Sequence, residues 1–287
     1  MKKVLLQLDS DALPSAFDAI TALDSGADHL LQYGSIQPHD VEAIVHGAIF
    51  TRGIGELKNS AIFIGGSDIA LGESNLLAVK EAFIGPMRVS VMLDSNGCNT
   101  TAAAAVRKII SAGDIRGKKV VVLAGTGPVG VSAAALMADE GAEVTITSRS
   151  EAKAQDCSKA IVKRFGHDVR SVVVTSFEET ETAMEGAHAV LCTGAAGITL
   201  LPEDLWKNHP TLKVLADVNA VPPLGIDDSK PHWNGKQIEG KVVFGALGIG
   251  GLKIQLHRAC VARLFEDNNS VLDAYEVYQV AKVIESK

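Results

Sequence analysis

Apolar runs recur along the chain with helical stretches between them, and this alternation predicts the fold. Near the N-terminus the aliphatic segments are KKVLLQLDS, DHLLQYG, SAIFIGG and MRVSVMLDS, and amphipathic stretches such as residues 68–83 separate them. Strands that alternate with helices are typical of a parallel or mostly parallel sheet.

A second series of the same kind begins after GDIRGKK. Its apolar segments are KVVVLAG, AEVTITS, VRSVVVT, AHAVLCTG, LKVLADVNA and KVVFGALGIGG. Six strand signals with helices between them predict a doubly wound nucleotide-binding domain. Two more helical segments follow, and we expect them to pack back on the first domain. The predicted domains are residues 1–103, completed by a helix over 256–287, and residues 104–255.

Composition and charge exclude several classes of partner. Apolar residues make up 47% and charged residues 21% of the chain, as in ordinary globular proteins. The net charge is −7 without any basic block, which excludes a nucleic-acid partner. No apolar stretch approaches the ~20 residues that span a bilayer. The four cysteines lack CxxC spacing and the eight histidines are scattered, which predicts a cytoplasmic protein without a metal site.

A glycine-rich turn follows the first strand of the second series and opens an alanine-rich helix. It consists of Gly125, Thr126, Gly127, Pro128, Val129 and Gly130. The first glycine permits a tight turn, the second lets the backbone approach a pyrophosphate, and the third lets helix and strand pack closely. This context indicates a Rossmann-type dinucleotide site, with the first domain as an α/β substrate domain.

The next strand ends in Ser148 and Arg149, with Lys153 shortly after. An acid at this place binds the ribose hydroxyls of NAD, whereas cations pair with the 2′-phosphate of NADP. The sequence therefore predicts NADP, and the nearby Glu151 keeps NAD as the weaker alternative.

Polar and small residues also follow two later strands. Thr193 and Gly194 end one strand and Asn219 follows the next. Ligands of open α/β sheets bind at these carboxyl ends, so the three residues are candidates for the nicotinamide half of the site. Ordinary turn chemistry is the alternative for each of them.

Four longer segments resemble one enzyme family. MLDSNGCNTTAAA, VVLAGTGPVG, NAVPPLGI and FGALGIGGLKIQLHRAC are similar to the NADP-dependent methylene-tetrahydromethanopterin dehydrogenases of methylotrophic bacteria, which are related to methylene-tetrahydrofolate dehydrogenases. The resemblance implies an N-terminal pterin-binding domain, a Rossmann-type NADP domain and a homo-oligomer, with a trimer suggested. It also implies the reaction, a reversible oxidation of a methylene-tetrahydropterin to its methenyl form in one-carbon metabolism.

The resemblance further implies which residues face the pterin. They are Phe17, Asp18, Asp94, Asn96, Asn99, Thr101 and Lys253. Carboxylates of Asp18 or Asp94 match the paired N–H donors of an amino-pyrimidinone edge. Turn and cap roles are the alternative for these acids, and Phe17 is equally suited to a core position.

The chemistry needs positioning rather than a proton relay. Hydride passes directly from the one-carbon bridge to nicotinamide, and the neighbouring pterin nitrogens stabilise the product cation. Lys253 is the single candidate at the catalytic position, and we expect it to orient the pterin. A lysine–tyrosine pair for cyclohydrolase activity would have to come from Tyr33 and Lys58, whose spacing gives no support.

Two other functions fit part of the sequence. One is a two-domain NAD(P)-dependent dehydrogenase of the shikimate or amino-acid type, which usually needs an ionisable Lys–Asp or His–Asp pair. The other is a regulatory protein that senses NADP. The extra first domain favours a second ligand, so catalysis ranks above sensing.

Overall fold

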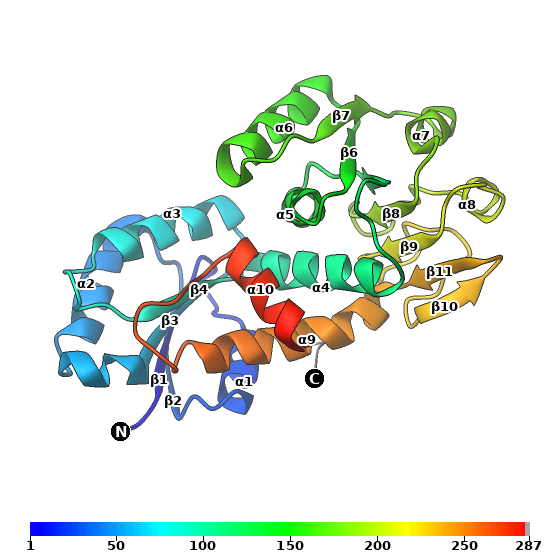
Figure 1. Cartoon of the computed structure of the whole chain (residues 1–287). Helices are drawn as coiled ribbons and strands as arrows, with labels where there is room; N and C mark the ends of the chain where they lie inside the picture. Colours follow the sequence, from blue (N-terminus) through cyan, green and yellow to red (C-terminus); the bar gives the residue numbers. More distant parts are fainter. Residues whose placement is uncertain (285–287) are drawn as a thin grey trace. The chain divides into compact units, whose positions relative to one another are not determined.

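The computed structural model describes residues 1–284 and divides the chain into two compact α/β units. One unit holds residues 1–100 and the segment from 254 onward, and the other holds residues 101–253. The chain leaves the first unit within α4 (Cys98–Ser111) and returns to it within α9 (Ala246–Arg263) (Figure 1). Residues 285–287, part of the expected C-terminal helix, lie outside the described residues.

The first unit is built on a parallel sheet. Its strands are β1 (Val4–Asp9), β2 (His29–Tyr33), β3 (Ser60–Gly65), β4 (Ser90–Leu93) and β12 (Val271–Leu272). They lie in the order β12-β4-β3-β1-β2, and all four pairings are parallel. The sequence did not predict β12, because two residues are too few for a periodic signal.

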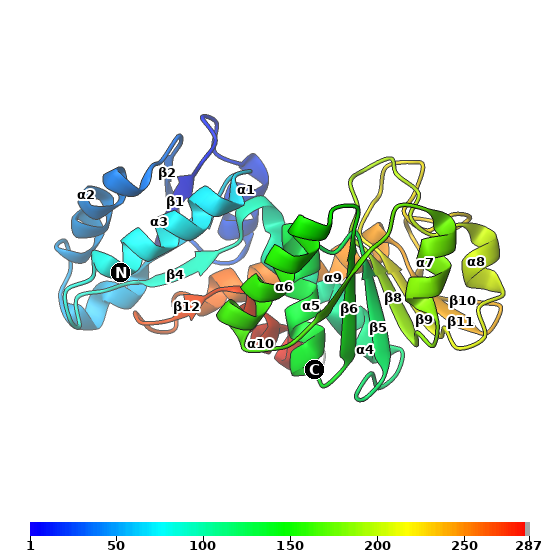
Figure 2. The same ribbon diagram turned by 90° about the horizontal axis from the view of Figure 1, so that it is seen from above.

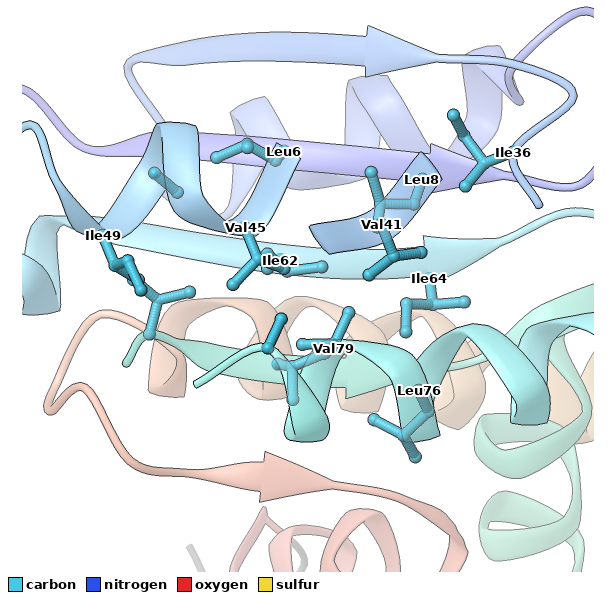
Figure 3. Packing of buried hydrophobic residues seen from close by; sticks show 14 of the residues in the cluster. Leu6, Leu8, Ile36, Val41, Val45, Ile49, Ile62, Ile64, Leu76 and Val79 are labelled. Carbon is cyan, nitrogen blue, oxygen red and sulfur yellow. The ribbon is translucent and has the colours of Figure 1, made fainter. Parts of the chain in front are cut away.

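Helices cover both faces of this sheet. The α-helices are α1 (Ala16–Asp24), α2 (Pro38–Ile49), α3 (Ile69–Glu81) and α10 (Ala274–Ile284), and the short 3-10 helices are η1 (Ile54–Asn59) and η2 (Ser95–Gly97). Side chains of a strand alternate between the faces. Leu6, Leu8, Ile62 and Ile64 pack on α2 and α3 in an aliphatic core (Figure 3). Phe63, between two of them, contacts α9 instead.

The second unit holds a seven-stranded sheet. Its strands are β5 (Lys119–Leu123), β6 (Glu143–Ser148), β7 (Arg170–Val173), β8 (Ala189–Cys192), β9 (Val214–Asp217), β10 (Asn234–Ile238) and β11 (Lys241–Phe244). The order is β10-β11-β9-β8-β5-β6-β7, and among these described strands only β10 is antiparallel to its neighbour. Figure 2 shows β5, β6, β8 and β9 running side by side. The doubly wound α/β fold predicted from the sequence is confirmed.

The helices of this unit connect successive strands. They are α5 (Pro128–Asp139), α6 (Glu151–Phe165), α7 (Phe177–Met184) and α8 (Glu203–Lys207). Within the described part of the chain, no helix is both long and apolar enough to cross a bilayer.

The last strand predicted in the second series is shorter in the structure than in the prediction. The apolar run KVVFGALGIGG was expected as a strand, but β11 ends at Phe244 and ALGIGG forms the first turns of α9. Gly245 and Gly248 serve close packing here. A Cβ at Gly248 would lie 2.1 Å from the carbonyl oxygen of Trp233. Lys253 therefore stands inside a helix.

Candidate functional site

The glycine turn of the second unit is shaped to hold a phosphate. Ala124 takes a left-handed conformation directly after β5, and the Gly125 N–H donates to the Thr147 carbonyl oxygen at 2.9 Å. Gly127 is the N-cap of α5 and Pro128 opens the helix. Since Gly127 has no side chain to accept from the first N–H groups, these donors and the helix dipole are available to an anion.

A cavity of about 480 Å³ lies beside this turn, at the carboxyl ends of β5 and β6. It is lined by Leu123, Ala124, Thr126, Thr147, Ser148, Arg149, Ser150, Lys153, Val174, Thr180, Gly194, Ala195, Ile198 and Leu200. Two of these described lining residues are cations and none is an acid. The structure thus brings together Thr126 with Ser148, Arg149, Lys153 and Gly194, as expected for one ligand.

Local hydrogen bonds fix the basic corner of the cavity. The Ser148 hydroxyl accepts from the Ser150 N–H at 3.2 Å, which tightens the turn that carries Arg149. The Ser150 hydroxyl in turn accepts from the Lys153 N–H at 3.4 Å and caps α6. Arg149 therefore leaves a rigid turn at the start of a 15-residue helix.

Two other cofactor candidates have their side chains committed to the backbone. The Thr193 hydroxyl donates to the carbonyl oxygens of Leu123 and Ala124 at 3.1 and 3.2 Å. The Asn219 amide nitrogen donates to the carbonyl oxygens of Val221 and Pro223, and its oxygen accepts from the Val221 N–H. Neither residue lines the cavity. Their contact with a cofactor stays a prediction, and their structural role is clear.

Asp217, the last residue of β9, anchors the loop that follows this strand. Its two carboxylate oxygens accept from the N–H groups of Asn219 at 2.9 Å and Ile226 at 3.2 Å. Burial raises the pKa of Asp217, while these backbone hydrogen bonds oppose the rise. The arrangement holds the loop in place and leaves no acid at the cavity.

In the first unit, Phe17 and Asp18 stand together on the first turn of α1. Ser15 caps this helix by accepting from the Asp18 N–H at 3.2 Å. The Phe17 residue is 48% exposed, whereas the Asp18 side chain is 17% exposed. A half-exposed aromatic ring beside a carboxylate suits a flat ligand with N–H donors on its edge.

The segment after β4 divides into buried and exposed residues. Asp94 accepts from the Thr100 N–H at 3.0 Å and from the Thr100 hydroxyl at 2.6 Å. The Asn99 amide donates to the Leu93 carbonyl oxygen at 2.8 Å. Both side chains are buried and close the turn into α4, whereas Asn96 is exposed in a left-handed conformation. Of these three predicted residues, Asn96 alone presents its side chain at the surface.

The remaining two candidates lie on helices. Thr101 is half-buried on α4 and Lys253 is half-buried on α9.

Sequence reasoning missed His257. This residue lies on α9 and is 1% exposed, with its ring 5.3 Å from the Phe63 ring and 6.1 Å from the Phe17 ring. Its Nδ1 is 3.5 Å from an Asp94 carboxylate oxygen, and its Nε2 is 4.0 Å from one of Asp18. The one available signal was its spacing, since it follows Lys253 by four residues on the same helix face.

A metal centre finds no support in the described part of the chain. There, no three side chains of His, Cys, Asp or Glu gather in a way that could hold an ion.

Comparison with known proteins decides the family. A family model described as methylene-tetrahydromethanopterin dehydrogenase, N-terminal, matches residues 16–96. A Methylorubrum extorquens AM1 protein named bifunctional protein MdtA is 50% identical over 283 residues, which is 98% of each chain. The chain belongs to the methylene-tetrahydromethanopterin dehydrogenase family.

A second relative supports this membership. The NAD(P)-dependent methylenetetrahydromethanopterin dehydrogenase of the same bacterium is 31% identical, with 93% of each chain covered. The resemblance seen in the sequence is therefore confirmed, and the protein is a dehydrogenase of this family. The matched segment 16–96 includes Phe17, Asp18, Asp94 and Asn96.

Solved structures show the same fold in more distant proteins. Shikimate 5-dehydrogenase from Listeria monocytogenes has a TM-score of 0.54 at 14% identity, covering 99% of this chain and 96% of that one. Quinate dehydrogenase from Corynebacterium glutamicum has a TM-score of 0.51 at 14% identity, with both chains covered completely. At this identity the likeness concerns the two-part α/β architecture alone.

Proposed function

We propose that the protein catalyses the reversible oxidation of methylene-tetrahydromethanopterin to the methenyl form, with NADP as hydride acceptor. The observation that carries the proposal is the family relationship over 98% of the chain. It agrees with the chemistry of both units. One holds a basic cavity beside a phosphate-binding turn, and the other presents an aromatic ring next to a carboxylate.

The residues of the second unit fit NADP. The open N-terminus of α5 suits the pyrophosphate, and the side chains of Arg149 and Lys153 suit a 2′-phosphate through charge-assisted hydrogen bonds. An NAD-specific site would instead place an acid near the adenosine ribose. Glu151, which lies between Arg149 and Lys153 in the sequence, does not line the cavity, and neither does Asp217. We infer a preference for NADP, with NAD as a weaker acceptor.

When bound, the nicotinamide accepts the hydride, and the pterin nitrogens stabilise the resulting cation without a general base. The work of this chain is then to hold and orient. Asp18 accepts from the N–H donors of the amino-pyrimidinone edge, and Phe17 packs on the flat ring system. A lysine next to the forming cation would oppose its charge. Lys253 therefore serves the proposed reaction by orienting the substrate.

Two further properties belong to the same proposal. All four cysteines are free thiols, which fits the reducing cytoplasm. Large apolar side chains on the first unit, among them Phe50 and Ile54, are more than half exposed. Such side chains are enriched at protein interfaces, and we propose a homo-oligomer, with a trimer as the expected order. Light scattering on the purified protein measures this order.

Turnover with defined substrates tests the function. Methylene-tetrahydromethanopterin and methylene-tetrahydrofolate are each offered with NADP and with NAD, and reduction of the nicotinamide is followed by absorbance. Turnover of methylene-tetrahydromethanopterin with NADP is expected. Turnover of methylene-tetrahydrofolate as well would show that the enzyme accepts a second one-carbon carrier. Failure with both carriers while NADP still binds would overturn the proposal in favour of another dehydrogenase or an NADP sensor.

A further inference from the structure

His257 lies between two carboxylates that differ in their access to solvent. The Asp94 side chain is fully buried, whereas Asp18 is the partly exposed member. Among the described residues, neither ring nitrogen of His257 has a hydrogen-bond partner, and both atoms are buried. Burying an imidazole without hydrogen bonds is costly. The cost requires compensation, and the two carboxylates are placed to supply it.

Different contacts hold the three groups in place. The imidazole Nδ1 lies 3.5 Å from an Asp94 oxygen and its Nε2 lies 4.0 Å from an Asp18 oxygen, and electrostatic interactions at such a buried place are stronger than at the surface. Asp94 is fixed by Thr100, and the Phe63 and Phe17 rings pack against the imidazole. Asp18 is the partly exposed member of the cluster.

We propose that His257 is a positioning residue that links the fixed Asp94 carboxylate to the Asp18 carboxylate. The imidazole thereby keeps the Asp18 carboxylate turned toward the paired N–H donors of the substrate's amino-pyrimidinone edge. Because its nitrogens are buried, His257 acts through Asp18 and does not touch the substrate. This inference rests on the proposed function and names the device that orders its pterin-binding carboxylate.

Asp9 and Cys260 are two further ionisable groups near this cluster. Asp9, at the end of β1, accepts from the N–H groups of Asp11 and Ser15. Burial raises the pKa of Cys260 on α9 far above its usual value, so this thiol stays neutral.

Two cations share α9 with the imidazole. Arg258 donates to an Asp24 carboxylate oxygen at 2.7 Å, and Lys253 stands one turn before His257. The imidazole lies within 4.0 Å of both carboxylates.

Steady-state kinetics of His257→Gln test the proposal. The amide has nearly the same size but cannot reproduce the contacts of both ring nitrogens with the two carboxylates, so KM for methylene-tetrahydromethanopterin should rise about tenfold or more. KM for NADP and kcat should each change less than about twofold, because His257 touches neither reactant.

A matched control and a double variant separate positioning from folding. His188→Gln alters a half-buried histidine of the second unit whose Nε2 also lacks a partner among the described residues, and its pterin KM should stay unchanged. Asp18→Asn should raise the pterin KM, and adding His257→Gln to it should change KM less than about twofold further.

Each outcome bears on one of the two proposals. No turnover by the wild type would sink the proposed function, and the inference about the substrate with it. If the wild type is active but the effects of Asp18→Asn and His257→Gln on the pterin KM multiply in the double variant, the positioning role alone is overturned. The same holds if His257→Gln leaves the pterin KM unchanged. If His257→Gln does not fold, nitrogen NMR of the His257 imidazole in the wild type replaces the kinetic test. Its resonances should shift when the pterin binds, and unchanged resonances would overturn the role.

Discussion

Gly130 lies directly against the backbone of Gly125 inside the glycine turn. A Cβ added at Gly130 would fall 2.6 Å from the carbonyl oxygen of Gly125 and 2.7 Å from its Cα. Backbone atoms cannot rotate away, so Gly130→Ala must push α5 off β5. We expect it to lower the free energy of unfolding by about 1–3 kcal/mol and to abolish NADP binding. Urea unfolding and an NADPH fluorescence titration measure the two effects.

Gly127→Ala is the matched control in the same turn. No atom lies within 4 Å of a Cβ built there, and its φ of −78° suits any residue. Stability should change by less than about 0.5 kcal/mol. NADP affinity should still fall, because the methyl group stands where the backbone approaches the pyrophosphate. Equal losses of stability in the two variants would contradict this account of the turn.

Arg149 should decide between the two nicotinamide cofactors. Arg149→Ala removes a charge-assisted contact to the 2′-phosphate, worth roughly 10- to 100-fold in kcat/KM with NADP. With NAD the change should stay below about threefold, because no phosphate is present to lose its partner. Lys159→Gln removes an exposed cation farther along α6. It should leave the ratio of kcat/KM with NADP to kcat/KM with NAD unaltered. A parallel loss with both cofactors would show that Arg149 is structural.

The cavity beside the glycine turn, our candidate cofactor site, could be located from the sequence because the segments that form it carry local signals. The turn from Gly125 to Gly130 and the basic pair Arg149 and Lys153 belong to neighbouring strand–helix connections. Because the strands are parallel, their carboxyl ends lie at the same edge of the sheet, and the residues that follow them come together there. The first four strands of the first unit were predictable for the same reason, since each is an aliphatic run bounded by turn residues.

The substrate side could be predicted only in part, because its contacts join distant segments. His257 meets Asp18 and Asp94 through the packing of α9 against α1 and β4, and a single histidine in a helix carries no signal of this. For Asp94 and Asn99 the sequence leaves two roles open, because turn caps and ligand contacts use the same residue types. Their hydrogen bonds in the folded chain show a structural role, and their contact with the substrate stays a prediction.

Thr100 should be important for stability through its link to Asp94. Thr100→Val keeps the shape but removes the hydroxyl that donates to the buried carboxylate at 2.6 Å. A buried acceptor that loses a donor costs about 1–3 kcal/mol in the free energy of unfolding. Thr182→Val removes a surface hydroxyl that donates within α7, and should cost less than about 0.5 kcal/mol. Urea denaturation compares them, and equal costs would contradict the buried role of Thr100.

Asp228 gives the second unit a defined response to acid. The Lys207 ammonium donates to its carboxylate at 2.6 Å, and this hydrogen bond lowers the pKa of Asp228 below its ordinary value of 3.8. A carboxylate with a lowered pKa in the folded state stabilises the fold above its unfolded pKa and loses this contribution as the pH falls through its folded pKa. Asp228→Asn should therefore be less stable than the wild type at pH 7.

The difference between wild type and Asp228→Asn should narrow as the pH falls below 3.8 and vanish once the carboxyl is protonated in both states. Asparagine suits this comparison because position 228 has a φ of +52°, which asparagine tolerates as well as aspartate. Added salt should shrink the difference at pH 7, since the pair is partly exposed. Asp156→Asn, an exposed acid on α6, serves as the control. A difference that stays constant from pH 7 into the acid range would show that the ion pair with Lys207 does not stabilise the loop.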